Sequence, residues 1–315
     1  MKTYCGDKCL FCSSCSIPLR GRNASLRNSL AGELINLAQV ALSVTCDKTM
    51  SNAILDGLAV MDTNVCAEES SFVRLINQTI RVRNSHGYTC CFQSREIRPF
   101  DMNEIRDDDK DVSSLKFLIL DALSGMASHA RLAGSRAMRD EIINNFFYKA
   151  LTTLAGTLTP PYLADIALEL GSVNLRCMEL LAGRSESAAL KASDSPALSI
   201  AKGVLLAGGC KERDGGLLSA ITSLPNETAL LTFGCCHEPN GIHLGSPLAA
   251  LDFIQSYDAA PIKLIYAWYG SRSAALLLTF ISMGIKEIYA GPFPDFFSAE
   301  TKDLLGLKEI SELTM

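Results

Sequence analysis

The sequence contains no apolar run that approaches the roughly 18 residues needed for a membrane-spanning helix. Its N-terminus also lacks the apolar stretch of about 7–15 residues that is typical of a signal peptide. We therefore expect a cytoplasmic protein that does not enter a membrane. Positive charge is in deficit as well, because 29 Lys and Arg stand against 34 Asp and Glu, for a net charge of −5. Since nucleic-acid binding calls for a basic surface, we expect no nucleic-acid partner.

Cysteine, by contrast, is abundant. Twelve cysteines in 315 residues are many for a cytoplasmic chain, in which thiols stay reduced. Cys5, Cys9, Cys12 and Cys15 follow a C-x3-C-x2-C-x2-C spacing, and a short loop can wrap four such thiolates around a cluster. The motif predicts a [4Fe-4S] cluster. A four-cysteine zinc site is the main alternative, although such sites more often use two separated CxxC pairs.

Five further cysteines lie in the first two thirds of the chain. Cys90 and Cys91 are adjacent, and one of them could replace a member of the first four as a cluster ligand. The alternative is that both are ordinary buried or loop cysteines. Cys46, Cys66 and Cys177 fall within helical patterns or near their ends, so we expect them to be packing residues.

The N-terminal part of the chain shows the periodicity of α-helices. Apolar residues recur at helical spacing over residues 25–45, 50–61, 71–82, 113–132, 138–154 and 161–181. The acidic stretch 107–111 is typical of a solvated loop. We therefore predict a first domain over residues 1–182, in which a cysteine-rich Fe–S loop precedes a helical domain.

The pattern changes after residues 182–199, whose small polar residues are typical of a linker. Four short apolar segments, 203–207, 228–233, 262–269 and 287–290, alternate with helical stretches at 216–223, 247–254, 272–283 and 299–305. Strands that alternate with helices indicate a parallel sheet. We predict a Rossmann-like parallel α/β domain over residues 200–315, which makes the fold class α + α/β.

A second group of potential metal ligands lies at the ends of the predicted strands. Cys210 follows the first strand, and Cys235, Cys236 and His237 follow the second. Ligands gather at the carboxyl ends of parallel strands, so thiolates and an imidazole at this place predict a second metal site, which His243 is close enough in sequence to join. The alternative is that these are small packing cysteines at strand ends.

Several segments of the chain resemble a known superfamily. In the helical half these are FLILDALSGMA at 117–127, ALELGSVN at 167–174 and MELL at 178–181. In the α/β half they are GGC at 208–210, LTFGC at 231–235, AWY at 267–269 and GIKEIYAGP at 284–292. In this order they resemble the hybrid-cluster protein (prismane, hydroxylamine reductase) and nickel carbon monoxide dehydrogenase superfamily.

The resemblance implies that the N-terminal cysteines hold the superfamily's proximal cluster. Its members place the fourth cysteine in a later Gly-x-Cys-Gly segment, whose nearest counterpart here is Thr89-Cys90-Cys91. The resemblance thus implies an alternative ligand set, which is Cys9, Cys12 and Cys15 with Cys90 or Cys91.

The resemblance also implies that this is a shortened form. The superfamily's middle α/β domain has no room between Leu181 and Lys202. Cys210 and Cys235 match two cysteine ligands of the catalytic cluster, whereas Ser256 stands in place of a cysteine and Gly270 in place of the glutamate of hybrid-cluster proteins.

Three functions follow from these features. The first is an iron–sulfur oxidoreductase in which the N-terminal [4Fe-4S] cluster passes electrons to a reduced or altered metal site, a second Fe–S or mixed-metal cluster. The resemblance implies that a small nitrogen or one-carbon substrate reacts there. The alternative is a non-catalytic electron-transfer or partner protein with the N-terminal cluster only, and the third is a zinc-stabilised module. Both redox functions imply a redox partner such as a ferredoxin. A chain without the middle domain also implies an apolar face that a homodimer would cover.

Overall fold

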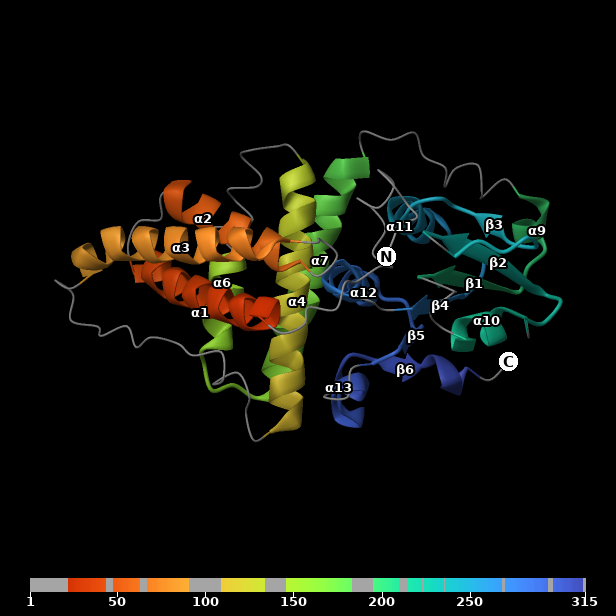
Figure 1. The fold of residues 1–315 in the computed structure, drawn as a ribbon. Coiled ribbons are helices and arrows are strands. Elements are labelled where there is room, and N and C mark those ends of the chain that lie inside the picture. The colour runs from red at the N-terminus through yellow and green to blue at the C-terminus, as the bar shows by residue number, and fades with distance from the viewer. Residues whose placement is uncertain are drawn as a thin grey trace.

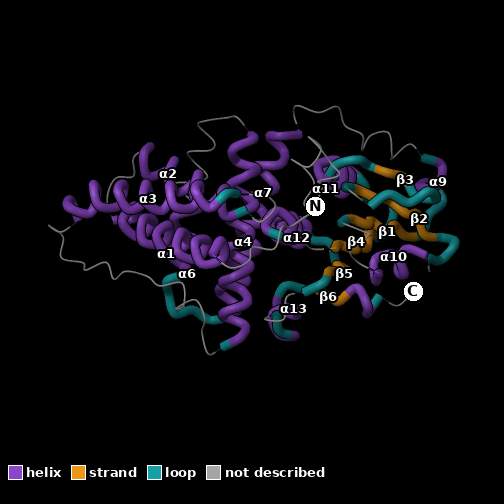
Figure 2. The backbone as a smooth tube through the Cα atoms, viewed as in Figure 1, coloured by secondary structure: helices purple, strands orange, loops and turns teal. Residues whose placement is uncertain are grey.

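Helices form the N-terminal part of the structure and a parallel sheet the C-terminal part (Figures 1 and 2). The computed structural model describes residues 22–43, 48–62, 67–90, 109–133, 146–182, 195–209, 215–222, 224–234, 236–267, 270–293 and 297–313. These segments include all ten of the predicted helices and all four of the predicted strands, in whole or in part.

The helical part consists of helices that bury one apolar face against each other. They are α1 (Arg22–Ser43), α2 (Lys48–Met61), α3 (Glu69–Cys90), α4 (Lys110–Ala133), α6 (Tyr148–Leu154) and α7 (Pro160–Ala182). In α1, the fully buried side chains Leu30, Leu34 and Leu37 recur at helical spacing and form the core stripe. Helix α1 contacts α2, α3 and α6, and α4 packs along α7. Pro160 begins α7, a position at which proline does not remove a helical hydrogen bond.

The sheet has six strands, all parallel. They are β1 (Gly203–Gly208), β2 (Thr228–Phe233), β3 (Ile242–His243), β4 (Ile262–Ala267), β5 (Glu287–Gly291) and β6 (Leu307–Glu309), in the order β3-β2-β1-β4-β5-β6. The remaining helices of the described segments are α9 (Pro196–Ser199), α10 (Gly215–Thr222), α11 (Pro247–Ser256), α12 (Ser271–Ser282), α13 (Ala299–Leu304) and the 3₁₀ helix η5 (Ile310–Glu312). Strands β2 and β3 are added on one side of β1, and β4, β5 and β6 on its other side, so the strand order reverses between β1 and β4.

Alternate residues of the strands face two different hydrophobic clusters. Val204 and Leu206 of β1 belong to a large cluster that also includes α11, α12 and the helical part. Leu205 and Ala207 belong to a smaller cluster with Leu217 of α10. This two-residue alternation follows from the pleat of a strand, and it places helices on both faces of the sheet.

Helix α12 lies between the sheet and the helical part (Figure 1). Every residue from Ser271 to Phe280 is buried, as expected for a helix that is covered on all sides. Its contact with α4 is close at Gly125, where a Cβ atom would lie 2.4 Å from the carbonyl oxygen of Ser271. Only glycine permits this approach, so Gly125 sets the distance between the two helices.

The start of α4 differs from the prediction for the acidic stretch. Asp109 precedes the helix, and its carboxylate accepts hydrogen bonds from the backbone N–H groups of Asp111 and Val112. Asp111 lies in the first turn and accepts hydrogen bonds from the hydroxyls of Ser298 and Thr301, at the start of α13. The end of this stretch is therefore a helix start held by tertiary contacts, and residues 107–108 lie outside the described residues.

The observed architecture is consistent with the predicted class α + α/β, because a helix-rich part is joined to an all-parallel sheet. Strands β3 and β6 and helix α9 are additions to the prediction. Within the described segments, we find no helix with the length and apolar character of a membrane span.

Candidate metal centre

The carboxyl ends of β1, β2 and β4 lie side by side at one edge of the sheet. Gly208, the last residue of β1, pairs with Phe233 of β2 on one side and with Tyr266 of β4 on the other. Ligands of open parallel sheets bind at this edge, at the point where the strand order reverses. Cys210 and Cys235, the two predicted ligands that follow β1 and β2 in the sequence, lie outside the described residues.

Gly209 brings the ends of β1 and β4 into close contact. Its φ of 111° is in the region that favours glycine. A Cβ atom at this position would lie 2.5 Å from the Cβ atom of Ala267. Hence any other residue would push β4 away at the switch point of the strand order.

Cys236, the third predicted ligand at this edge, is fully buried. Its side chain belongs to the smaller hydrophobic cluster, together with Ala207, Ile265 and Ala267 of the sheet. Its backbone N–H donates to the carbonyl oxygen of Phe233 over 3.3 Å, which closes a turn directly after β2. The structure therefore places this thiol against the sheet, on the face that α10 covers.

His237, the predicted imidazole ligand, is exposed and stacks on His243 of β3. The ring centroids are 4.9 Å apart, and the planes differ by 27°. The Nδ1 atom of His243 lies 3.1 Å from the hydroxyl of Thr232. Partial burial and the neighbouring His237 lower the pKa of His243, although a hydrogen bond with the backbone of Cys236 acts in the opposite direction.

The described residues at this edge do not form a metal site by themselves. Cys236 faces the apolar cluster while His237 faces solvent, so the two side chains are not brought together. In the part of the chain that the structure describes, no group of three His, Cys, Asp or Glu side chains could hold a metal ion. A metal centre here therefore needs ligands from residues outside the described ones, among which Cys210 and Cys235 are the predicted ligands.

The predicted N-terminal ligands Cys5, Cys9, Cys12 and Cys15 lie outside the described residues, as does Cys91. Cys90 is the last residue of α3, and its side chain is not described. The cluster at these cysteines thus stays a prediction.

Cys177 is one of the cysteines that we expected to pack, and the structure confirms this for it. It is fully buried in α7, and burial raises the pKa of its thiol to about 12. Cys46 and Cys66 lie outside the described residues.

A buried ion pair supports the start of α12, which follows β4 at the same edge. The Nε atom of Arg272 lies 2.7 Å from the carboxylate of Asp62, and their side chains are 8% and 0% exposed. Ser128 of α4 donates to the same carboxylate oxygen over 2.7 Å. Sequence reasoning missed this network, because Asp62 and Arg272 are 210 residues apart and nothing in either local pattern pairs them.

The fold places the protein in a general structural class. A helix-rich part is joined to an all-parallel α/β sheet, in which the strand order reverses between β1 and β4. No family model matches the chain. It is similar over part of its length to proteins named hydroxylamine reductase. The one from Gloeothece citriformis is 39% identical over 82 residues, which are 25% of this chain and 15% of that protein.

Two other hydroxylamine reductases match longer stretches. The protein from Lawsonia intracellularis is 28% identical over 159 residues, 40% of this chain and 30% of that protein. The protein from Porphyromonas gingivalis is 26% identical over 188 residues, 51% of this chain and 34% of that protein. The chain thus spans about a third or less of the length of the curated relatives it matches. These partial similarities support the resemblance to the hybrid-cluster superfamily.

Proposed function

We propose that the chain is an iron–sulfur oxidoreductase of the kind that its relatives' name describes. The observation that carries this proposal is the pairing of Gly208 with Phe233 at the ends of β1 and β2. In the sequence, each of these residues is followed two positions later by a predicted cysteine ligand, Cys210 and Cys235. The similarity to hydroxylamine reductases supports the same assignment.

In this proposal the chain has a Rossmann-like domain over residues 200–315 and an N-terminal domain over residues 1–182. The N-terminal domain holds a [4Fe-4S] cluster at Cys5, Cys9, Cys12 and Cys15, or at the last three with Cys90 or Cys91. Four thiolates are the usual ligands of such a cluster, which supplies one-electron chemistry when bound. A ferredoxin-like redox partner would supply the electrons, and the chain would work in the cytoplasm.

The second site would use Cys210 and Cys235, with His237 as the exposed imidazole of the same edge. Cys236 would have to leave the apolar cluster to bind a metal, so we propose it only as a secondary ligand. The reduction of hydroxylamine to ammonia and water takes up two electrons and two protons. His243, whose ring stacks on that of His237, is the imidazole that would transfer such protons at this edge.

The alternative is an electron-transfer protein that holds the N-terminal cluster alone. Two positions favour it, because the structure occupies them with residues that are not soft or anionic ligands. Ser256 ends α11 and donates its hydroxyl proton to the carbonyl oxygen of Asp252 over 2.8 Å. Gly270 is the N-cap of α12 and has no side chain to offer.

Iron and acid-labile sulfide per chain, measured on anaerobically purified protein, distinguish the two functions. For the oxidoreductase we expect about seven or eight irons per chain, falling to about four in the double variant Cys210→Ser/Cys235→Ser. Hydroxylamine turnover with a chemical electron donor should be lost in the same variant.

The matched control is Cys177→Ala, which removes a thiol that the structure places in the core of the helical part. Its iron content should equal that of the unchanged chain. About four irons in both the unchanged chain and the double variant would establish the electron-transfer alternative and contradict a second site. A colourless protein with zinc and no iron would contradict both functions.

A further inference from the structure

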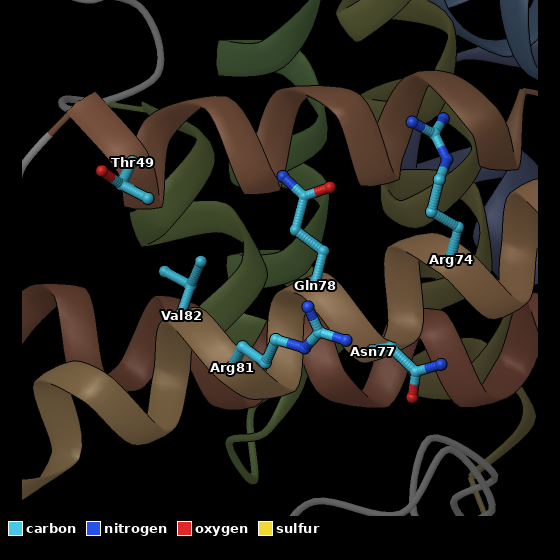
Figure 3. A pocket seen from close by; sticks show the side chains of 6 residues that line it. All are labelled: Thr49, Arg74, Asn77, Gln78, Arg81 and Val82. Atoms are coloured by element: carbon cyan, nitrogen blue, oxygen red, sulfur yellow. The ribbon is translucent and has the colours of Figure 1, made fainter.

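Helices α2 and α3 form a groove whose lining residues belong to neither candidate metal site (Figure 3). Its volume is about 560 Å³, and it is lined by Thr49 of α2 and by Arg74, Asn77, Gln78, Arg81 and Val82 of α3. Val82 is buried, whereas the side chains of Arg74, Asn77 and Arg81 are exposed. The lining is therefore polar and basic, and it includes no carboxylate.

Two other arginines of the helical part are held in ion pairs with described residues, unlike the two that line this groove. Arg83 of α3 pairs with Glu33 over 2.6 Å, and Arg27 of α1 pairs with Asp121 of α4. For Arg74 and Arg81, no ion pair or hydrogen bond with another described residue is found. A chain with a net charge of −5 thus has a local excess of positive charge that its own described carboxylates do not neutralise.

The positions of the two arginines along α3 suit an extended ligand. Arg81 lies seven positions after Arg74, so their backbones are about 10 Å apart along the helix axis at 1.5 Å per residue. Asn77 and Gln78 lie between them in the sequence, and their amides can donate and accept hydrogen bonds. Carboxylates spaced along an extended acidic segment can each pair with one of the two guanidinium groups.

We propose that this groove is the docking site for an acidic segment of a partner protein. The favoured contacts are charge-assisted hydrogen bonds from the two guanidinium groups to carboxylates of the partner. A single-stranded nucleic acid is the less favoured polyanion, because the groove has no aromatic side chain on which a base could stack.

The position of the groove on α3 indicates which kind of protein the partner is. This inference rests on the proposed function. Helix α3 ends at Cys90, nine residues beyond Arg81 and so about 13 Å further along the helix. Cys90 is one of the alternative ligands of the N-terminal cluster. An acidic protein that docks here is thus the electron donor of the chain, and electrostatic attraction raises its rate of association.

A binding measurement on the full chain tests the docking site without any need for a cluster. The probe is a fluorescein-labelled decaglutamate peptide, followed by fluorescence anisotropy at low ionic strength, with a labelled decaglutamine peptide as the neutral comparison. We expect the unchanged chain to bind decaglutamate and not decaglutamine. The double variant Arg74→Gln/Arg81→Gln should bind about twofold to thirtyfold more weakly, as for the loss of two exposed ion pairs.

The matched control is Arg176→Gln, which removes an exposed arginine of α7 outside the groove. It should bind decaglutamate as the unchanged chain does. Equal affinity in all three proteins would overturn the docking site. So would tighter binding of labelled ten-residue oligothymidine that depends on the same arginines, or displacement of decaglutamate by equimolar inorganic diphosphate.

Reduction by an acidic ferredoxin then tests the step that names the partner. The rate at which the chain's cluster is reduced should fall in the double variant and stay unchanged in Arg176→Gln, at equal iron content. If decaglutamate binds at the groove but the protein contains no iron, the proposed function fails and the docking site stands. If the cluster is present and its reduction is insensitive to Arg74 and Arg81, the assignment of the electron donor is wrong.

Discussion

Thr79 of α3 has a buried hydroxyl for which the described residues provide no hydrogen-bond partner. Its side chain is fully buried. Thr279 of α12 is equally buried, but its hydroxyl donates to the carbonyl oxygen of Ala275 and accepts a hydrogen bond from the side-chain amide of Asn174. The two threonines thus share burial and differ in hydrogen bonding.

This contrast predicts opposite effects of the same substitution. Thr79→Val replaces an unpaired hydroxyl with a methyl group of similar size, so we expect the free energy of unfolding to rise by about 1 kcal/mol. Thr279→Val leaves the Asn174 amide without its acceptor, so we expect a loss of about 1–3 kcal/mol. Urea unfolding of both variants measures the difference. A loss of stability in Thr79→Val would contradict the conclusion that the Thr79 hydroxyl makes no hydrogen bond.

The predicted ligands show what a sequence can and cannot reveal about a single residue. Cys236 and His237 are neighbours in the sequence, and their chemistry alone made both of them candidate ligands. In the structure one is buried against the sheet and the other is exposed beside His243. Which side of a turn a residue occupies depends on the backbone after β2, and no local pattern encodes it. Nothing in the sequence analysis singled out Arg74 and Arg81, because their lack of partners among the described residues depends on the packing of neighbouring helices.

At the scale of elements, the contact between α4 and α13 links two helix starts. Ser298 is the N-cap of α13 and accepts a hydrogen bond from the backbone N–H of Thr301 over 2.9 Å. Asp111 of α4 accepts hydrogen bonds from both of their hydroxyls. Burial alone would raise the pKa of Asp111, but the hydrogen bonds from Ser298 and Thr301 outweigh it and lower that pKa.

This shift makes part of the stability depend on pH. A carboxylate whose pKa is lowered by folding stabilises the protein above its unfolded pKa, and this contribution is lost as the pH falls through the folded pKa. We expect Asp111→Asn to lose on the order of 1 kcal/mol at pH 7 and progressively less as the pH falls below about 4. The measurement is the free energy of urea unfolding from pH 3 to 7. Asp165→Asn, at an exposed position of α7, is the control and should change little at any pH.

Most of the elements could be predicted because their periodicity is long enough to recognise. Helices α1, α2, α4 and α7 and strands β1, β2 and β5 agree with their predicted bounds to within a few residues. Strands β3 and β6 have only two and three residues, which is too short for an alternating pattern. Helix α3 continues past the predicted end at Val82 to Cys90, through polar residues that lack an apolar stripe.

At the scale of the whole molecule, the ion pair of Asp62 and Arg272 joins the end of α2 to the start of α12. Removal of one partner leaves the other charge buried, so we expect Asp62→Ala and Arg272→Ala each to cost about 3–5 kcal/mol. The double variant Asp62→Ala/Arg272→Ala should cost less than the sum of the two, because it leaves no unpaired charge.

Urea unfolding of the two single variants and the double variant gives the coupling energy. A double variant that loses as much as the sum would show that the two groups act independently, which would contradict a stabilising pair. Lys149→Ala/Glu169→Ala provides the comparison, since that pair is exposed on α6 and α7 and should contribute less than about 1 kcal/mol.

The buried helix α12 has a consequence for the way the chain is made. A ribosome adds roughly 5–20 residues per second, and about a hundred residues separate the end of α7 from the end of α12. For roughly 5–20 s, therefore, α4 and α7 have been synthesised while the helix that covers them has not. During that interval their apolar faces meet water or a molecular chaperone, and the helical part completes its core only when the sheet is nearly finished.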